Sequence, residues 1–116
     1  MIIGVRTADK TTVLDVNGEV DLHHSPQLLA KLTELIKQKR KSILLNFQGV
    51  TYIDSSGLAS LIGAFQLLRP QGGRLLLSNI SKPIQNVFAV ARLDKVFSIH
   101  ATEAEALRSL GQGGPE

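Results

Sequence analysis

Apolar residues follow two different periods along this chain, and their alternation limits the folds that it can adopt. A strand is predicted where apolar or small residues occupy every second position, at Leu14, Val16, Gly18, Val20 and Leu22. A helix is predicted where they recur on one face, at Leu28, Leu29, Leu32, Leu35 and Ile36. The two patterns keep alternating after this point, which indicates an α/β fold.

The predicted order of elements is β-β-α-β-α-β-α-β-α. The first strand lies around Ile3 and Val5, and a polar turn at 8–11 separates it from the long alternating strand. Later strands are predicted at 43–47, 75–77 and 96–99, and helices at 25–36, 58–68 and 81–91 and from Thr102. Helical connections between strands imply right-handed crossovers and a mostly parallel sheet, with the first strand antiparallel at an edge.

The size and composition indicate one soluble globular domain. The 116 residues are 43% hydrophobic and 20% charged, and we expect the domain at 1–110 and a flexible tail at 111–116. The absence of Cys excludes disulfides, zinc–thiolate sites and thiol nucleophiles. We expect a cytoplasmic protein without a membrane span, because the sequence has no signal-peptide pattern and no apolar run of about 20 residues.

The formal net charge of +3 first suggests a nucleic-acid partner. The local excess of charge comes mainly from Lys37, Lys39, Arg40 and Lys41, which follow the first predicted helix. Basic side chains are favoured there by the helix dipole. With no Trp and a single Tyr, the chain offers little for bases to stack on, so we expect a solvated surface and no nucleic-acid partner.

The segment Asp54-Ser55-Ser56-Gly57-Leu58 lies where an apolar strand gives way to a helix. Hydroxyl and carboxylate side chains at such a junction suit a helix cap, because the first backbone N–H groups of a helix have no partner within it. A hydroxyl there also lies at the positive end of the helix dipole, where a phosphate is favoured. The residues alone leave both roles open, cap and phosphoacceptor.

Catalytic, metal and cofactor sites are poorly supported by the residues. Ser56 lacks the glycine two positions earlier that marks the nucleophile of α/β-hydrolases, so we expect no enzyme. His23 and His24 are adjacent on an extended segment and point to opposite sides, which makes them poor joint ligands of a metal. Gly72-Gly73 follows a helix and precedes a strand, the reverse of a phosphate-binding loop, and we expect no cofactor.

Three segments together resemble the STAS domain, and more narrowly the bacterial anti-sigma factor antagonists. They are Gly18-Glu19-Val20-Asp21, Asp54-Ser55-Ser56-Gly57-Leu58 and Leu93-Asp94-Lys95-Val96-Phe97. The resemblance runs from about Ile2 to Leu110. It implies that the unphosphorylated protein binds an anti-sigma factor, itself a serine kinase, and so releases a sigma factor.

The resemblance also implies which residues form the site. Ser56 matches the phosphoacceptor, and Ser55 is the fallback. Asp21 and Asp54 match acidic residues that flank the partner-binding surface. That surface is expected to comprise Asp21, His23, Asp54, Ser55, Ser56, Gly57 and Leu58.

Two other functions are kept as alternatives. STAS domains also serve as adaptors in transporter-associated or stress-sensing complexes, where the serine would be only a cap. A small hydrolase that uses Ser56 would instead turn over generic esters. Weak self-association through the first edge strand and binding of a nucleotide are left open.

Overall fold

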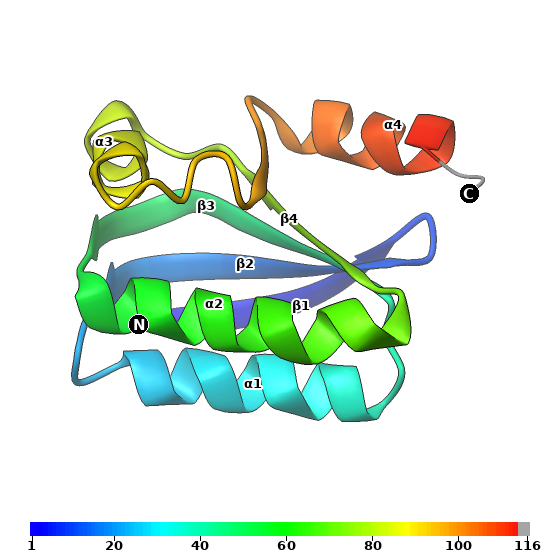
Figure 1. The fold of residues 1–116 in the computed structure, drawn as a ribbon, viewed down its shortest axis with the longest axis horizontal. Helices are drawn as coiled ribbons and strands as arrows, with labels where there is room; N and C mark the ends of the chain where they lie inside the picture. Colours follow the sequence, from blue (N-terminus) through cyan, green and yellow to red (C-terminus); the bar gives the residue numbers. More distant parts are fainter. Residues whose placement is uncertain (114–116) are drawn as a thin grey trace.

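The five strands lie in the sheet in the order in which they occur in the chain, β1-β2-β3-β4-β5. The computed structural model describes residues 1–113 (Figure 1). The strands are β1 (Ile2–Ala8), β2 (Thr11–Val20), β3 (Ser42–Ile53), β4 (Arg74–Ser78) and β5 (Ser98–His100). The helices are α1 (Ser25–Lys37), α2 (Ser55–Leu68), α3 (Lys82–Val90) and α4 (Glu103–Gly113), and a 3₁₀ turn (Arg69–Gln71) follows α2.

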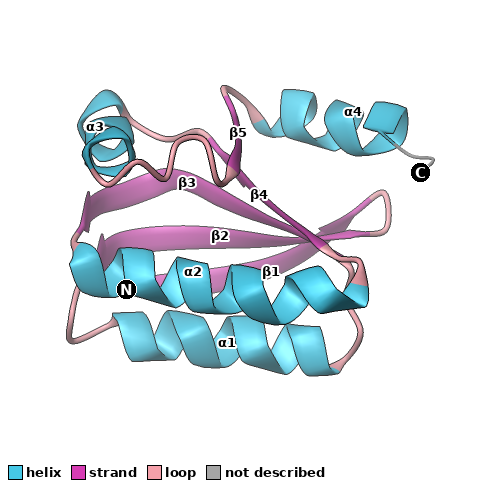
Figure 2. Ribbon diagram, in the orientation of Figure 1, coloured by secondary structure: helices cyan, strands magenta, loops and turns pink. Residues whose placement is uncertain are grey.

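The predicted fold class is confirmed. β1 pairs with β2 antiparallel at the edge of the sheet, and each later strand pairs with its predecessor in parallel. A helix connects each parallel pair (Figure 2). The polar turn between the first two strands is also where the sequence predicts it, at Asp9 and Lys10.

The main core lies on the sheet face that is covered by α1, α2 and α3. Successive strand residues point to opposite faces, so Leu14, Leu45 and Leu77 belong to this core, while Val13, Leu44 and Leu76 face α4. The second cluster is smaller and is closed by Ala106 with Leu107 and Leu110. The buried stripe of α1 consists of Leu28, Leu32, Leu35 and Ile36, all from the predicted set.

Aromatic side chains fix α3 against the rest of the main core. Phe88 of α3 packs edge-to-face on Phe47 of β3 and on Phe97, with ring centroids 6.5 and 6.0 Å apart. Phe97 in turn packs on Phe65 of α2 at 5.6 Å. Such pairs add to the stabilisation from apolar burial, and this chain of rings sets the separation of α2 and α3.

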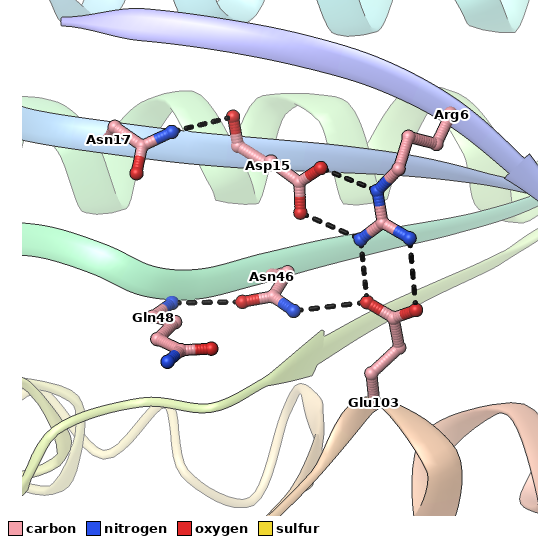
Figure 3. A network of polar contacts seen from close by, with 6 residues as sticks. All are labelled: Arg6, Asp15, Asn17, Asn46, Gln48 and Glu103. Atoms are coloured by element: carbon pink, nitrogen blue, oxygen red, sulfur yellow. Dashed lines mark hydrogen bonds and ion pairs between the residues drawn. The ribbon is translucent and has the colours of Figure 1, made fainter.

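A polar network ties α4 to the sheet (Figure 3). The Arg6 guanidinium pairs with Asp15 at 2.5 and 2.7 Å and with Glu103 at 2.7 and 3.1 Å. Asn46 donates to Glu103 at 3.0 Å and accepts from the backbone N–H of Gln48. β1, β2 and β3 thus hold the first residue of α4.

Several boundaries differ from the sequence-based predictions. Leu22 continues the alternation of β2, but the strand ends at Val20 and the Leu22 side chain is 74% exposed. The pairing of β2 with β3 also shifts register near Asn17 and Gly18, although the strand is continuous. α4 reaches Gly113, three residues past the predicted domain end at Leu110, and 114–116 lie outside the described residues.

Candidate functional site

The carboxyl ends of β2 and β3 bring the predicted site residues together. Parallel neighbours end at the same edge of the sheet, so the loop after Val20 and the residue after Ile53 lie side by side. The backbone N–H of Asp54 approaches the carbonyl of Val20 at 3.4 Å. We call this part of the molecule the switch end, comprising residues 21–24 and 52–58.

Asp54, and not a serine, caps α2. Its backbone is extended, and its carboxylate accepts from the N–H of Ser56 at 2.9 Å and of Gly57 at 3.2 Å. Of the capping residues that the sequence offers at this junction, Asp54 is therefore the one that caps the helix. Ser56 is the second residue of the helix, half-buried, and its hydroxyl forms no hydrogen bond with any residue in 1–113. The cap leaves the serine side chain free.

Gly57 allows α2 to begin against the end of β2. A Cβ at this position would lie 2.5 Å from the Val20 carbonyl oxygen and 2.7 Å from the Ile53 side chain, closer than real Cβ contacts. One turn later the Ser60 hydroxyl contacts the carbonyl of Ser56 at 3.2 Å and that of Ser25 at 3.3 Å. These contacts hold the starts of α1 and α2 together.

Asp21 organises the start of α1. Ser25 is the first residue of this helix and is buried. Asp21 accepts the His24 N–H at 2.9 Å with its carboxylate and the Ser25 N–H at 2.7 Å with its carbonyl. His24 Nδ1 also lies 2.8 Å from the Asp21 carboxylate. Desolvation raises the pKa of Asp21, but the hydrogen bonds from His24 outweigh it and hold that pKa below its usual range.

An acidic hollow opens beside the cap of α2. It is about 570 Å³ in volume and is lined by Asp21, Leu22, His23, Tyr52 and Asp54. Leu22 and Tyr52 are 74% and 48% exposed, so two large hydrophobic side chains lie on the surface among the polar groups. Large apolar side chains among polar groups on a surface are typical of a protein-binding site.

An apolar groove lies on the other side of the same helix start, between α2 and α3. It is about 400 Å³ in volume and is lined by Ser55, Leu58, Asn86, Val87, Val90 and Ala91. Val90 is 86% exposed. Asp54 thus lines the acidic hollow, Ser55 lines the apolar groove, and Ser56 follows directly.

The structure gathers most of the predicted site residues on one surface and adds others. Asp21, His23 and Asp54 share the hollow, whereas Ser55 and Leu58 line the groove. Gly57 is buried, and its lack of a side chain lets the start of α2 lie against the end of β2. Sequence reasoning missed Leu22, Tyr52 and Val90. Val90 lies off the face of α3 on which Ile84 and Phe88 are buried, and an apolar residue off that face was the available signal.

No three His, Asp or Glu side chains among residues 1–113 lie close enough together to hold a metal ion. None of the helices in that range has the length and apolar character needed to cross a bilayer. His100 lies away from the other histidines, where its ring contacts the hydroxyls of Ser98 and Ser109.

Comparisons with known proteins identify the family of this chain. The model of the STAS domain family matches residues 3–106. An anti-sigma-B factor antagonist of Bacillus subtilis is 29% identical over 85% of this chain and 90% of its own length. An anti-sigma F factor antagonist of Paenibacillus polymyxa is 26% identical over 84% of this chain and 85% of its own length.

A solved structure has the same fold. It is the Bacillus cell fate determinant SpoIIAA in its phosphorylated form, 30% identical, with a TM-score of 0.72 over 94% of this chain and 99% of that one. The family match spans nearly all of the described residues. The chain therefore belongs to the STAS domain family, where its relatives are anti-sigma factor antagonists.

Proposed function

We propose that this protein is an anti-sigma factor antagonist that is switched by phosphorylation of Ser56. In the unphosphorylated state the switch end binds an anti-sigma factor of the serine-kinase type, and a sigma factor is released. The protein is then a substrate of its partner's kinase site and not an enzyme. Its compartment is the cytoplasm, where transcription takes place.

The observation that carries the proposal is the free Ser56 hydroxyl beside two binding features. Asp54 already satisfies the backbone N–H groups of Ser56 and Gly57, so the serine is not needed as a cap. The acidic hollow is lined by Asp54 and the apolar groove by Ser55, the two residues before Ser56, and they offer polar and apolar contacts to a partner. A modification at Ser56 would therefore lie next in the chain to residues of both features.

Phosphorylation is expected to act on the interface and to leave the fold intact. It adds about −1.5 to −2 charges and three acceptor oxygens. The positive end of α2 stabilises such a charge by about 0.3–2 kcal/mol within the protein. At an interface the same phosphate must lose water and face the partner, and a penalty of about 3–4 kcal/mol weakens binding a few hundredfold.

The direct test is a phosphorylation assay followed by mass spectrometry. The protein, its Ser56→Ala variant and its Ser55→Ala variant are incubated with the cognate anti-sigma factor and ATP. We expect phosphate on Ser56 in the unmodified protein and in Ser55→Ala, and none in Ser56→Ala. Equal labelling of Ser56→Ala would refute the assignment and turn attention to Ser55, which is the more exposed of the two.

The assay also separates the switch from the adaptor function. A protein that binds its partner tightly and is never phosphorylated would use the same groove as a permanent docking surface. A third outcome, hydrolysis of generic esters that Ser56→Ala abolishes, would indicate an enzyme. The same three proteins serve for all three measurements, which are phosphate incorporation, partner binding and ester turnover.

A further inference from the structure

The end of the molecule opposite Ser56 carries most of its positive charge. Seven of the thirteen lysines and arginines lie in three segments, at 9–10, 37–41 and 69–74, which we call the basic end. They are Lys10, Lys37, Lys39, Arg40, Lys41, Arg69 and Arg74, and all are exposed. Asp9 is the only acid in these segments, so the basic end has a formal charge of +6 and the rest of the chain −3.

The fold brings the three segments together. They are the turn between β1 and β2, the loop after α1, and the turn after α2 that leads into β4, all at the right of Figure 1. The Arg74 N–H donates to the Lys41 carbonyl at 2.6 Å. Arg40 Nη1 contacts Thr12 Oγ1 at the start of β2 at 3.1 Å. The charges therefore form one surface.

Local structure accounts for only a small part of this charge. Within residues 1–113, none of the seven side chains lies within ion-pair distance of a carboxylate. The carboxyl ends of α1 and α2 together contribute about one negative charge. An excess of about five positive charges is left facing solvent at this end.

We infer that the basic end binds the surface of an anionic phospholipid bilayer. Clusters of four to eight lysines and arginines on one surface are attracted to anionic lipid headgroups. Leu67, in the last turn of α2, is 49% exposed and offers an apolar contact at the edge of the patch. The three segments contain no aromatic residue, which disfavours single-stranded nucleic acid as the occupant because bases bind by stacking.

Such binding would leave the switch end accessible. α2 has 14 residues and is about 20 Å long, and Ser56 and Arg69 lie at its two ends. A protein resting on a bilayer through its basic end thus points Ser56 away from the lipid. The inference does not rest on the proposed function, since no residue of the switch end takes part.

The test is flotation with vesicles of equal parts phosphatidylglycerol and phosphatidylcholine, compared with pure phosphatidylcholine. We expect the protein to float with the anionic vesicles at low ionic strength and to be released at about 0.5 M salt, where charges are screened within a few ångströms. The triple variant Lys41→Glu, Arg69→Glu, Arg74→Glu should lose about a hundredfold in partitioning.

A matched variant controls for net charge. The control is the triple variant Lys82→Glu, Arg92→Glu, Lys95→Glu, which also reverses the charge of three exposed residues. Both triple variants have a formal net charge of −3. We expect the control to keep most of its binding. Equal loss in the two variants, or no preference of the unmodified protein for anionic vesicles, would overturn the inference. So would tighter binding of single-stranded DNA at the same ionic strength, abolished by the basic-end variant.

Discussion

At the scale of single residues, Gly57 matters because of what lies beside it. An alanine Cβ there would lie 2.5 Å from the Val20 carbonyl oxygen, so Gly57→Ala should lower the free energy of unfolding by about 1–3 kcal/mol. Gly63, in the same helix, is the control, because a Cβ there lies 3.7 Å from Leu29. Gly63→Ala should stabilise by about 0.5–1 kcal/mol. Urea unfolding measures both, and equal effects would contradict the close approach at Gly57.

Ser56 is expected to tolerate a negative charge within the fold. Ser56→Asp should weaken binding of the anti-sigma factor at least about tenfold, because the carboxylate must be desolvated at the interface. Its melting temperature should stay close to that of the unmodified protein, because the charge lies at the positive end of α2. Calorimetry measures binding and melting. A collapse in melting temperature would show that the residue is chiefly structural.

At the scale of elements, α2 and α3 together form the apolar groove of the candidate site. Val90→Lys places a charge in the apolar groove and should weaken binding of the anti-sigma factor by about tenfold or more. Val96→Lys is the control, since Val96 is 45% exposed and does not line the groove. Stability should be unchanged in both. Equal binding by the two variants would remove the groove from the proposed interface.

The attachment of α4 should depend on pH. Hydrogen bonds from Arg6, followed by one from Asn46, lower the pKa of Glu103 in the folded protein. The stabilisation is therefore present at neutral pH and is lost as pH falls through that pKa. Glu103→Gln should cost about 0.5–1 kcal/mol at neutral pH, since the pair is partly exposed, and the difference should shrink as pH falls through the lowered pKa of Glu103.

The control for α4 is Glu105→Gln. Glu105 lies in the same first turn of α4 as Glu103. Removing its charge therefore costs the same interaction with the helix dipole, but the hydrogen bonds between Arg6 and Glu103 stay intact. Unfolding curves from pH 3 to 7 should show a larger loss of stability at neutral pH for Glu103→Gln than for Glu105→Gln, and that excess should shrink as pH falls. Identical curves for the two variants would assign the effect to the dipole.

At the scale of the whole molecule, the periodic part of the fold follows from the sequence and the rest does not. Apolar spacing specifies the strands and helices, because burial on one face imposes the period. The predicted extent of β2 was wrong at Leu22. The chain turns at Asp21, whose oxygens accept the N–H groups of His24 and Ser25 at the start of α1. The contact of Arg6 with Glu103 spans 97 positions, and no local pattern signals it.

For the site, the sequence indicated the segment that caps the helix but not which of its residues forms the cap. Asp54, Ser55 and Ser56 are all common caps, and sequence could not choose among them. The choice depends on backbone geometry, because Asp54 alone is extended and reaches the N–H groups of the next turn. The groove at Val90 required the packing of α3 on Phe47 and Phe97, which brings together residues distant in the chain.

The strand order affects how the chain can fold during its synthesis on the ribosome. Every strand pairs with the one synthesised just before it, so no strand must wait for a segment beyond the next helix. Contacts between near neighbours in sequence favour rapid folding. The sheet can therefore extend one unit at a time as synthesis proceeds, and β5 with α4 is the last of the described elements to join it.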